Sequence, residues 1–480
     1  MAKYRPSKRF LLAMGGMLPL GAALVFGLLP DLGVIAAPPI PGVIVFPETR
    51  LADQAPSSTK FLATRARLAA DWMEDRQWDL LSWDRNPWKR PRPQGFGEHY
   101  FELQKSTRPS DQAAFASINL WTGPLYAQIR RRYPELAVPL KSVPDASNGF
   151  LKWLELSERV KADPSKDLSF PASLRSYLDN SGPWNPADAK AWLASEKAKV
   201  DEVRAIGLLT EQSIAGIEIG RYSFIGARHA KNCAEALLLE ARLAAESGDT
   251  ATALECVRAA RGLADHFDKV ETPSLLGITV YILLNLELQK QVLSQIIPAL
   301  PSGQLDPQAW EDAVRPEVVP PSDFSRIMKG EWNVCIRQYL VPVLCDADDP
   351  HYPGDPETLV DFYSSRFVDV MKAYDRRSMP DWITIAAPPL RDSSHLSRQS
   401  RNLCAIMFVG EAAWCKGMLR AQYVMGMNSA AFAIMKGEAI PRDPIHGLPY
   451  VWDPASRKLS APPDPAFAEM KVEPVTVPAP

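Results

Sequence analysis

The acidic stretch at residues 345–357, CDADDPHYPGDPE, comes closest to a metal-binding spacing in this chain of 480 residues. Carboxylates stand at positions one, three and twelve of a calcium-binding loop: Asp346, Asp348 and Glu357. Position five is Pro350, which has no side-chain oxygen, and position six is His351, where the sharp turn requires glycine. We therefore favour a solvated turn rich in Asp and Pro, with bound calcium as the alternative, and we expect no cofactor.

Catalytic motifs in the sequence are incomplete. Residues 57–60, Ser-Ser-Thr-Lys, match the S-x-x-K motif of acyl-enzymes, but the K-T-G and S-D-N motifs that complete such a site are absent from the sequence. The sequence also contains no H-E-x-x-H, G-x-S-x-G, P-loop or complete dinucleotide-binding motif. A non-enzymatic protein is therefore favoured, and no catalytic, cofactor-binding or metal residue is assigned.

His229 and the cysteines are the remaining candidates for chemistry. His229 could pair with Glu235 or another acid in space, although a histidine on a helix is more often solvated or satisfied by ordinary hydrogen bonds. Cys233 and Cys256 fall on opposite arms of a predicted helical hairpin, at heights that differ by roughly 10 Å, so we expect no disulfide between them. No C-x-x-C pair exists to support zinc or thioredoxin-like chemistry. The even number of cysteines leaves other disulfides open: Cys233, Cys256, Cys335, Cys345, Cys404 and Cys415.

Residues 227–267 predict the hairpin around which the chain is organised. Apolar residues recur every three or four positions in both halves, and alanine at the facing positions allows two helices to approach closely. Gly248 suits a left-handed C-cap, and Asp249 suits the N-cap of the second helix. Residues 275–288 are apolar almost all round and predict a buried third helix packed on the hairpin.

The hairpin resembles a single tetratricopeptide-type hairpin, and the sequence shows no second copy at a fixed period. Hairpins of that type present grooves to peptides, so the resemblance implies a protein or peptide partner.

The N-terminus predicts a membrane anchor. Four basic residues precede residues 10–29, a run of 20 residues without a charge, which is long enough to cross a bilayer: Lys3, Arg5, Lys8 and Arg9. The basic flank would stay in the cytoplasm, so the bulk of the chain would lie outside the inner membrane. A cleaved signal peptide ending near Ala36 is the alternative.

We divide the chain by its changes of pattern. The predicted regions are a basic flank and anchor at 1–33, a proline-rich spacer at 34–59, a helical region at 60–205, the hairpin with its buried helix at 206–300, a second helical region at 301–435, a β-hairpin at 436–461 and a disordered tail at 462–480.

The β-hairpin carries the string D-P-x-x-G-x-P-Y-x-W-D at residues 443–453. It resembles the C-terminal segment of a group of uncharacterised exported bacterial proteins, in which an alanine-rich helical hairpin precedes such a strand pair. It is also similar to the D-P-W-G-x-P-Y segment of the major type II secretion pseudopilins, but the processed leader and its glutamate are absent here, so we attribute that likeness to shared turn chemistry.

The charge balance argues against a nucleic-acid partner, because 54 basic and 56 acidic residues give a formal charge of −2. We predict a mostly α-helical, single-pass, membrane-anchored protein with a small C-terminal β-hairpin that binds or scaffolds a protein or peptide outside the inner membrane. The alternatives are an exported hydrolase with a site assembled from distant residues and a component of a secretion or envelope apparatus.

Overall fold

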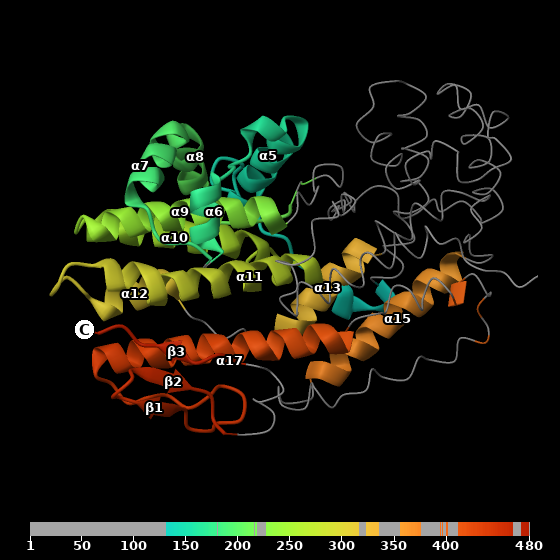
Figure 1. Ribbon diagram of the computed structural model, residues 1–480. Coiled ribbons are helices and arrows are strands. Elements are labelled where there is room, and N and C mark those ends of the chain that lie inside the picture. The colour runs from blue at the N-terminus through green and yellow to red at the C-terminus, as the bar shows by residue number, and fades with distance from the viewer. Residues whose placement is uncertain are drawn as a thin grey trace, which may run out of the picture.

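The structure, a computed structural model, describes residues 131–179, 181–215, 217, 227–315, 323–335, 356–375, 394, 396, 400–401, 411–463 and 472–479. This part of the chain is mostly helical, with one small antiparallel sheet near the C-terminus (Figure 1). The predicted anchor, the S-x-x-K motif, Asp346 and Asp348 lie outside the described residues. Glu357 lies in a helix, but its side chain is likewise outside the described part.

The predicted hairpin is confirmed as α9 (Ala227–Glu246) and α10 (Thr250–Asp268). Gly248 has φ +79°, as a left-handed turn residue should. Asp249 caps α10, because its side chain accepts a hydrogen bond from the Thr252 N–H. Alanines from both helices are buried in the hairpin, including Ala241, Ala245 and Ala260.

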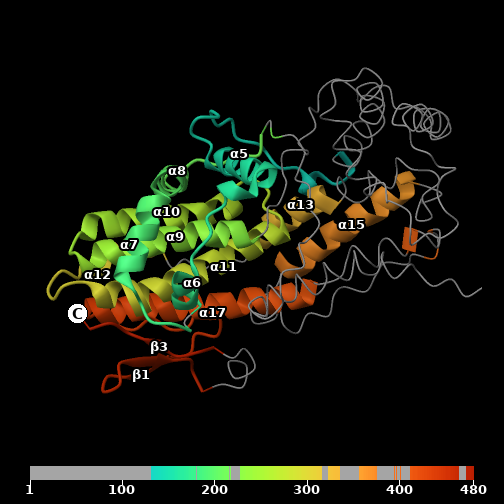
Figure 2. The ribbon, with the colours of Figure 1, turned by 45° about the horizontal axis from the view of Figure 1, so that its top comes forward.

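Two layers enclose the hairpin (Figures 1 and 2). On one side lie α5 (Gly149–Ala162), α7 (Pro186–Ser195) and α8 (Lys197–Gly207), while α6 (Ala172–Leu178) crosses in front of α9. On the other side α11 (Leu275–Gln291) packs on the hairpin, as the apolar run predicted. Every residue of α10 from Ala259 to Asp268 is buried, so α10 has no open face there to form a groove of the tetratricopeptide kind.

Glycines allow α8 to cross α10 with backbone against backbone. A Cβ on Gly262 would lie 1.7 Å from the carbonyl oxygen of Gly207, and one on Gly207 would lie 2.2 Å from that of Ala259. No side chain fits at either position. The sequence contains no signal for this crossing, because a glycine in a helical pattern indicates only a weaker helix. Two helices precede the hairpin here: α7 ends at Ser195 and α8 ends at Gly207.

The second half of the described chain continues the helical layers. α11 passes into a short π-helical turn (Val292–Ile296) and a 3₁₀ turn (Ile297–Ala299), and α12 (Pro307–Val314), α13 (Asp323–Cys335), α15 (Pro356–Asp375) and α17 (Glu411–Lys436) follow. α17 ends at Lys436, and residues 400–401 before it are also helical. Further 3₁₀ turns lie near the start of the described chain, at Pro134–Leu136 and Pro164–Lys166.

The C-terminal sheet corrects the predicted β-hairpin and tail. β1 (Val451–Asp453) pairs with β2 (Lys458–Ser460), but β2 also pairs with β3 (Val475–Thr476), so the sheet has three strands. β3 comes from the tail that we expected to be disordered, and Val477 beside it is buried. A two-residue strand between prolines carries too little periodicity to be recognised in the sequence.

Within the described residues no helix is both long and apolar enough to cross a membrane. The predicted anchor at 10–29 lies outside that part of the chain.

Candidate functional site

The first turns of α9 gather the side chains with the most chemistry. His229 Nδ1 lies 2.7 Å from Asp167 Oδ1, and the imidazole stacks on Trp153 with ring centroids 5.0 Å apart. Asp167 is also fixed by the Leu168 N–H, which donates to the same carboxylate oxygen at 2.8 Å. Burial raises the pKa of Asp167, but the hydrogen bond and charge of His229 outweigh it and hold this pKa below its ordinary value.

Cys233 lies near His229 and Asp167, so the three residue types of a Cys-His-acid triad are present, but their geometry is not that of a triad. Its Sγ lies 3.8 Å from Nε2 and 4.0 Å from Nδ1 of His229, so the sulfur sits beside the ring and is not aligned with one nitrogen. Burial raises the pKa of Cys233 well above its usual value, which keeps the thiol protonated. The imidazole is only 3% exposed, so among the described residues little of this group is open to a substrate.

Glu235 has a different partner from the one considered in the sequence. Its carboxylate accepts a hydrogen bond from Arg175 Nη1 at 3.0 Å and lies 3.4 Å from Lys231 Nζ. Arg175 Nη2 also donates to Asn232 Oδ1 at 3.0 Å. Burial raises the pKa of Glu235 despite these two cations. The acid that binds His229 is Asp167, 62 residues earlier in the chain, and spacing along one helix could not reveal it.

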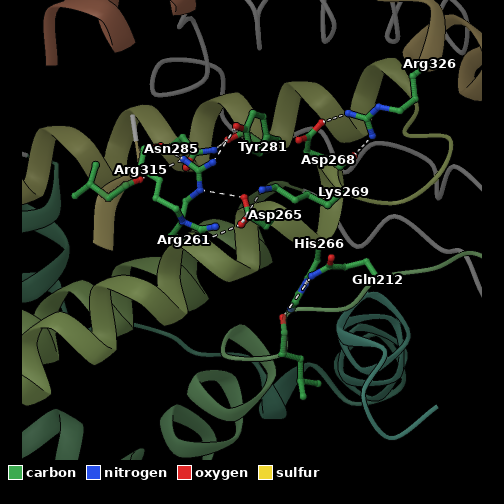
Figure 3. Close-up of polar contacts among 12 residues, drawn as sticks. Gln212, Arg261, Asp265, His266, Asp268, Lys269, Tyr281, Asn285, Arg315 and Arg326 are labelled. Atoms are coloured by element: carbon green, nitrogen blue, oxygen red, sulfur yellow. Dashed lines mark hydrogen bonds and ion pairs between the residues drawn. The ribbon is translucent and has the colours of Figure 1, made fainter. Parts of the chain in front are cut away.

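A second polar cluster lies on the opposite helix of the hairpin, around Asp265 (Figure 3). Asp265 Oδ1 accepts from Arg261 Nε at 3.0 Å, and Asp265 Oδ2 accepts from Arg315 Nη2 at 2.9 Å. Lys269 Nζ lies 3.8 Å from the same Oδ2. Arg261 is fully buried, and its Nη1 donates to the carbonyls of Val314 and Arg315, which end α12.

This Asp265 cluster is best explained as structural, because its cations satisfy one carboxylate and the carbonyls at a helix end. Sequence reasoning missed it, although Arg261 and Asp265 stand at i and i+4 on one helix, the spacing of a helical ion pair. What the sequence could not show is that this pair is buried and reaches α12.

An open groove separates α5 from α8. It has a volume of about 610 Å³, and its lining combines charged side chains with apolar ones: Lys152, Glu155, Glu158, Arg159, Ala162, Glu202 and Ile206. Arg159 Nη2 and Glu202 Oε1 form an ion pair between the two helices. Lys152 Nζ pairs with Glu155 Oε2 at 2.9 Å within α5. The groove can therefore offer both signs of charge beside the apolar side chains of Ala162 and Ile206.

The described residues contain no group of three or more His, Cys, Asp or Glu side chains placed to hold a metal ion. No protein-family model matches this chain, and neither the curated proteins nor the solved structures include a detectable match. The site is therefore interpreted from its own geometry.

The cysteines of the hairpin provide a direct check on that geometry. Cys233 and Cys256 do not bond each other, as predicted; both are free and both are fully buried. Burial and the charge of Glu240 raise the pKa of Cys256 to about 12. At about pH 8 its thiolate fraction is then on the order of 10⁻⁴, and we expect alkylation of both thiols by iodoacetamide to be at least about a thousandfold slower than in the unfolded chain. Peptide mass mapping measures this, and labelling at the rate seen in guanidinium chloride would contradict the packing.

Proposed function

We propose that this protein is a membrane-tethered, extracytoplasmic helical protein that binds or scaffolds a protein or peptide partner. The charge-free run at 10–29 behind four basic residues supports the tether and its direction. The near-zero net charge supports a partner other than nucleic acid.

The observation that carries the binding role is the groove between α5 and α8. The groups with the strongest chemistry, His229 and Cys233, are buried, whereas the groove is open and displays ionised side chains beside apolar surface. Recognition surfaces combine such features, because apolar contact supplies affinity and charge supplies specificity. The tetratricopeptide likeness implied that the hairpin itself binds the partner. Because other helices enclose the hairpin, we place the proposed binding surface on the outer helices α5 and α8.

Site-specific photocrosslinking tests this assignment. A photoreactive residue at Ala162, which is exposed in the groove, is expected to capture a discrete adduct in cell-envelope preparations. The matched control is Val451, which is 50% exposed on the C-terminal sheet and should capture little. Reversing two groove charges, Glu155→Lys with Glu202→Lys, should reduce the Ala162 adduct several-fold. Equal adduct yields from Ala162 and Val451, or an Ala162 yield that the charge reversal leaves unchanged, would contradict the groove assignment.

A hydrolase is the second candidate, and the His229–Asp167 hydrogen bond is the observation that favours it. Any such activity should disappear in His229→Gln and fall strongly in Asp167→Asn, because the acid orients the imidazole. A panel of ester, peptide and glycoside substrates, with both variants as controls, distinguishes the two functions.

A further inference from the structure

Residues 211–215 and 217 fasten the start of α5 to the end of α10. We call this segment, together with Asn148 and Gly149, the clasp. The Gly149 N–H donates to the Glu211 carbonyl at 2.8 Å. Asn148 Nδ2 donates to the Ser213 carbonyl at 2.9 Å, and the Ser213 N–H donates back to Asn148 Oδ1 at 3.2 Å.

The clasp encloses a small apolar core of its own, separate from the main core: Phe150, Leu151, Leu154, Ile214, Ile217 and Val270. From Trp153 onward α5 also contributes to the main core, through Trp153, Leu156 and Val160. Loss of the clasp bonds would therefore open a local unit at the first turn of α5, while Trp153 and the hairpin core stay packed.

His266 is the first of two titratable side chains that hold this unit (Figure 3). Gln212 Nε2 lies 3.1 Å from Nδ1, and His266 Nε2 lies 2.9 Å from the Ile206 carbonyl oxygen. The carbonyl can only accept, so the ring is neutral with its proton on Nε2, and Nδ1 accepts from Gln212. A proton on Nδ1 would face the Gln212 amide N–H and break that bond. Turning the amide over would place its Oε1 against the Leu209 carbonyl, to which Gln212 Nε2 donates at 3.3 Å. Gly149 lies against the ring, where a Cβ would be 2.2 Å from Cε1, so the ring has no room to move away.

Glu271 is the second side chain that holds the clasp. Its Oε1 accepts from the Lys141 N–H at 2.7 Å and from Ser213 Oγ at 2.6 Å, while its Oε2 accepts from the Ile214 N–H at 3.0 Å. The carboxylate is buried, so its charge is stabilised by these donors. Glu271 thereby holds Lys141, Ser213 and Ile214 together at the end of α10.

We propose that the clasp is an acid-sensitive conformational switch, in which protonation of His266 releases residues 211–215 and the start of α5 while the α9–α10 hairpin stays folded. This inference is independent of the proposed partner binding. Release would expose the apolar side chains of the small core only when the surroundings of the protein become acidic.

The charged groups around His266 agree with this direction. Asp265 precedes His266 on α10 and favours the added proton, but its carboxylate already binds Arg261 and Arg315. The other elements that contact the ring present neutral groups: Gln212, Gly149 and the carbonyl of Ile206. Near Glu271, Arg326 bonds the Val270 carbonyl and forms an ion pair with Asp268.

The pKa of the His266 ring determines whether the clasp loses stability as pH falls or as pH rises. Burial lowers the pKa of His266 to about 4, whereas an open clasp would let the ring titrate near its ordinary value of about 6.5. As pH falls, the open state therefore takes up the proton first. The clasp is fully stable above about pH 6.5, and its opening equilibrium should rise by up to about tenfold per pH unit between about pH 6.5 and pH 4.

Amide hydrogen exchange of the full chain, corrected for the intrinsic exchange rate at each pH, measures that equilibrium by residue. Between about pH 7 and pH 4.5 we expect opening at Leu151, Ser213 and Ile214 to rise by at least about tenfold more than opening at Leu238 and Val257 in the hairpin. Parallel loss of protection in both regions would overturn the switch, because it would show global acid unfolding.

Two variants separate the switch from ordinary destabilisation. Gln212→Glu is nearly isosteric and would place a carboxylate beside Nδ1, so the protonated ring would gain a partner and the clasp should stay closed at about pH 4.5. His446→Gln, at an exposed histidine in the C-terminal region, should leave the profile of the natural chain unchanged. If the clasp of the Gln212→Glu variant opens with the same pH dependence as that of the natural chain, the role of His266 is overturned.

Discussion

Replacing Gly262 with alanine is expected to lower the free energy of unfolding by about 3 kcal/mol or more. The new methyl group would lie 1.7 Å from the carbonyl oxygen of Gly207, and backbone cannot turn aside as a flexible side chain can. α8 would have to move off α10, which opens the main core along Val200 and Val203. The roughly 1 kcal/mol that alanine gains over glycine in a helix is too small to compensate.

Urea unfolding followed by circular dichroism measures the change. Gly277→Ala is the matched control, because Gly277 is also a buried helical glycine but its Cβ would meet its nearest neighbour, the Phe267 carbonyl oxygen, at 3.3 Å. We expect that control to stay within about 1 kcal/mol of the natural chain. Equal midpoints for the two variants would show that α8 does not cross α10 at Gly207.

Removing the carboxylate of Asp265 is the second change for which we expect a large loss of stability. Asp265→Ala should destabilise the protein by about 3–5 kcal/mol, because Arg261 is fully buried and would lose its charged partner. Arg315 and Lys269 can turn toward water, since each is more than a third exposed, so most of the cost falls on Arg261.

Asp201→Ala is the control for this prediction. Asp201 also has cationic partners, Lys197 at 2.6 Å and Arg204 at 3.6 Å, but it is 42% exposed. Exposed ion pairs contribute about 0–1 kcal/mol, so the control should unfold close to the natural chain. If Asp265→Ala and Asp201→Ala cost the same, the Asp265 cluster is not buried as described.

The hairpin could be predicted because its information is local. Apolar spacing fixes the faces of α9 and α10, and Gly248 with Asp249 fixes the turn between them. The same holds for α11, whose uniformly apolar sequence predicts burial on all sides. Helices that begin at Asp-Pro or Asn-Pro, such as α7 and α12, were recognisable from their caps.

The candidate site could not be predicted, because its partners are distant in sequence. Nothing near His229 points to Asp167, and nothing near Ser213 points to Glu271. Gly207 and Gly262 show the same limit: a glycine in a helical pattern indicates only a weaker helix until its neighbour on another helix is known. β3 was missed for a related reason, since a strand of two residues depends wholly on its pairing with β2.

The central proposal, a tethered protein that acts outside the inner membrane, is tested most directly by protease treatment of bacterial spheroplasts that express the full chain, with intact mass and membrane fractionation measured in parallel. The account predicts a chain that begins at or near Met1, sediments with membranes and is digested from outside. A soluble chain that begins near Ala37, or a membrane-bound chain that the external protease cannot reach, would contradict it.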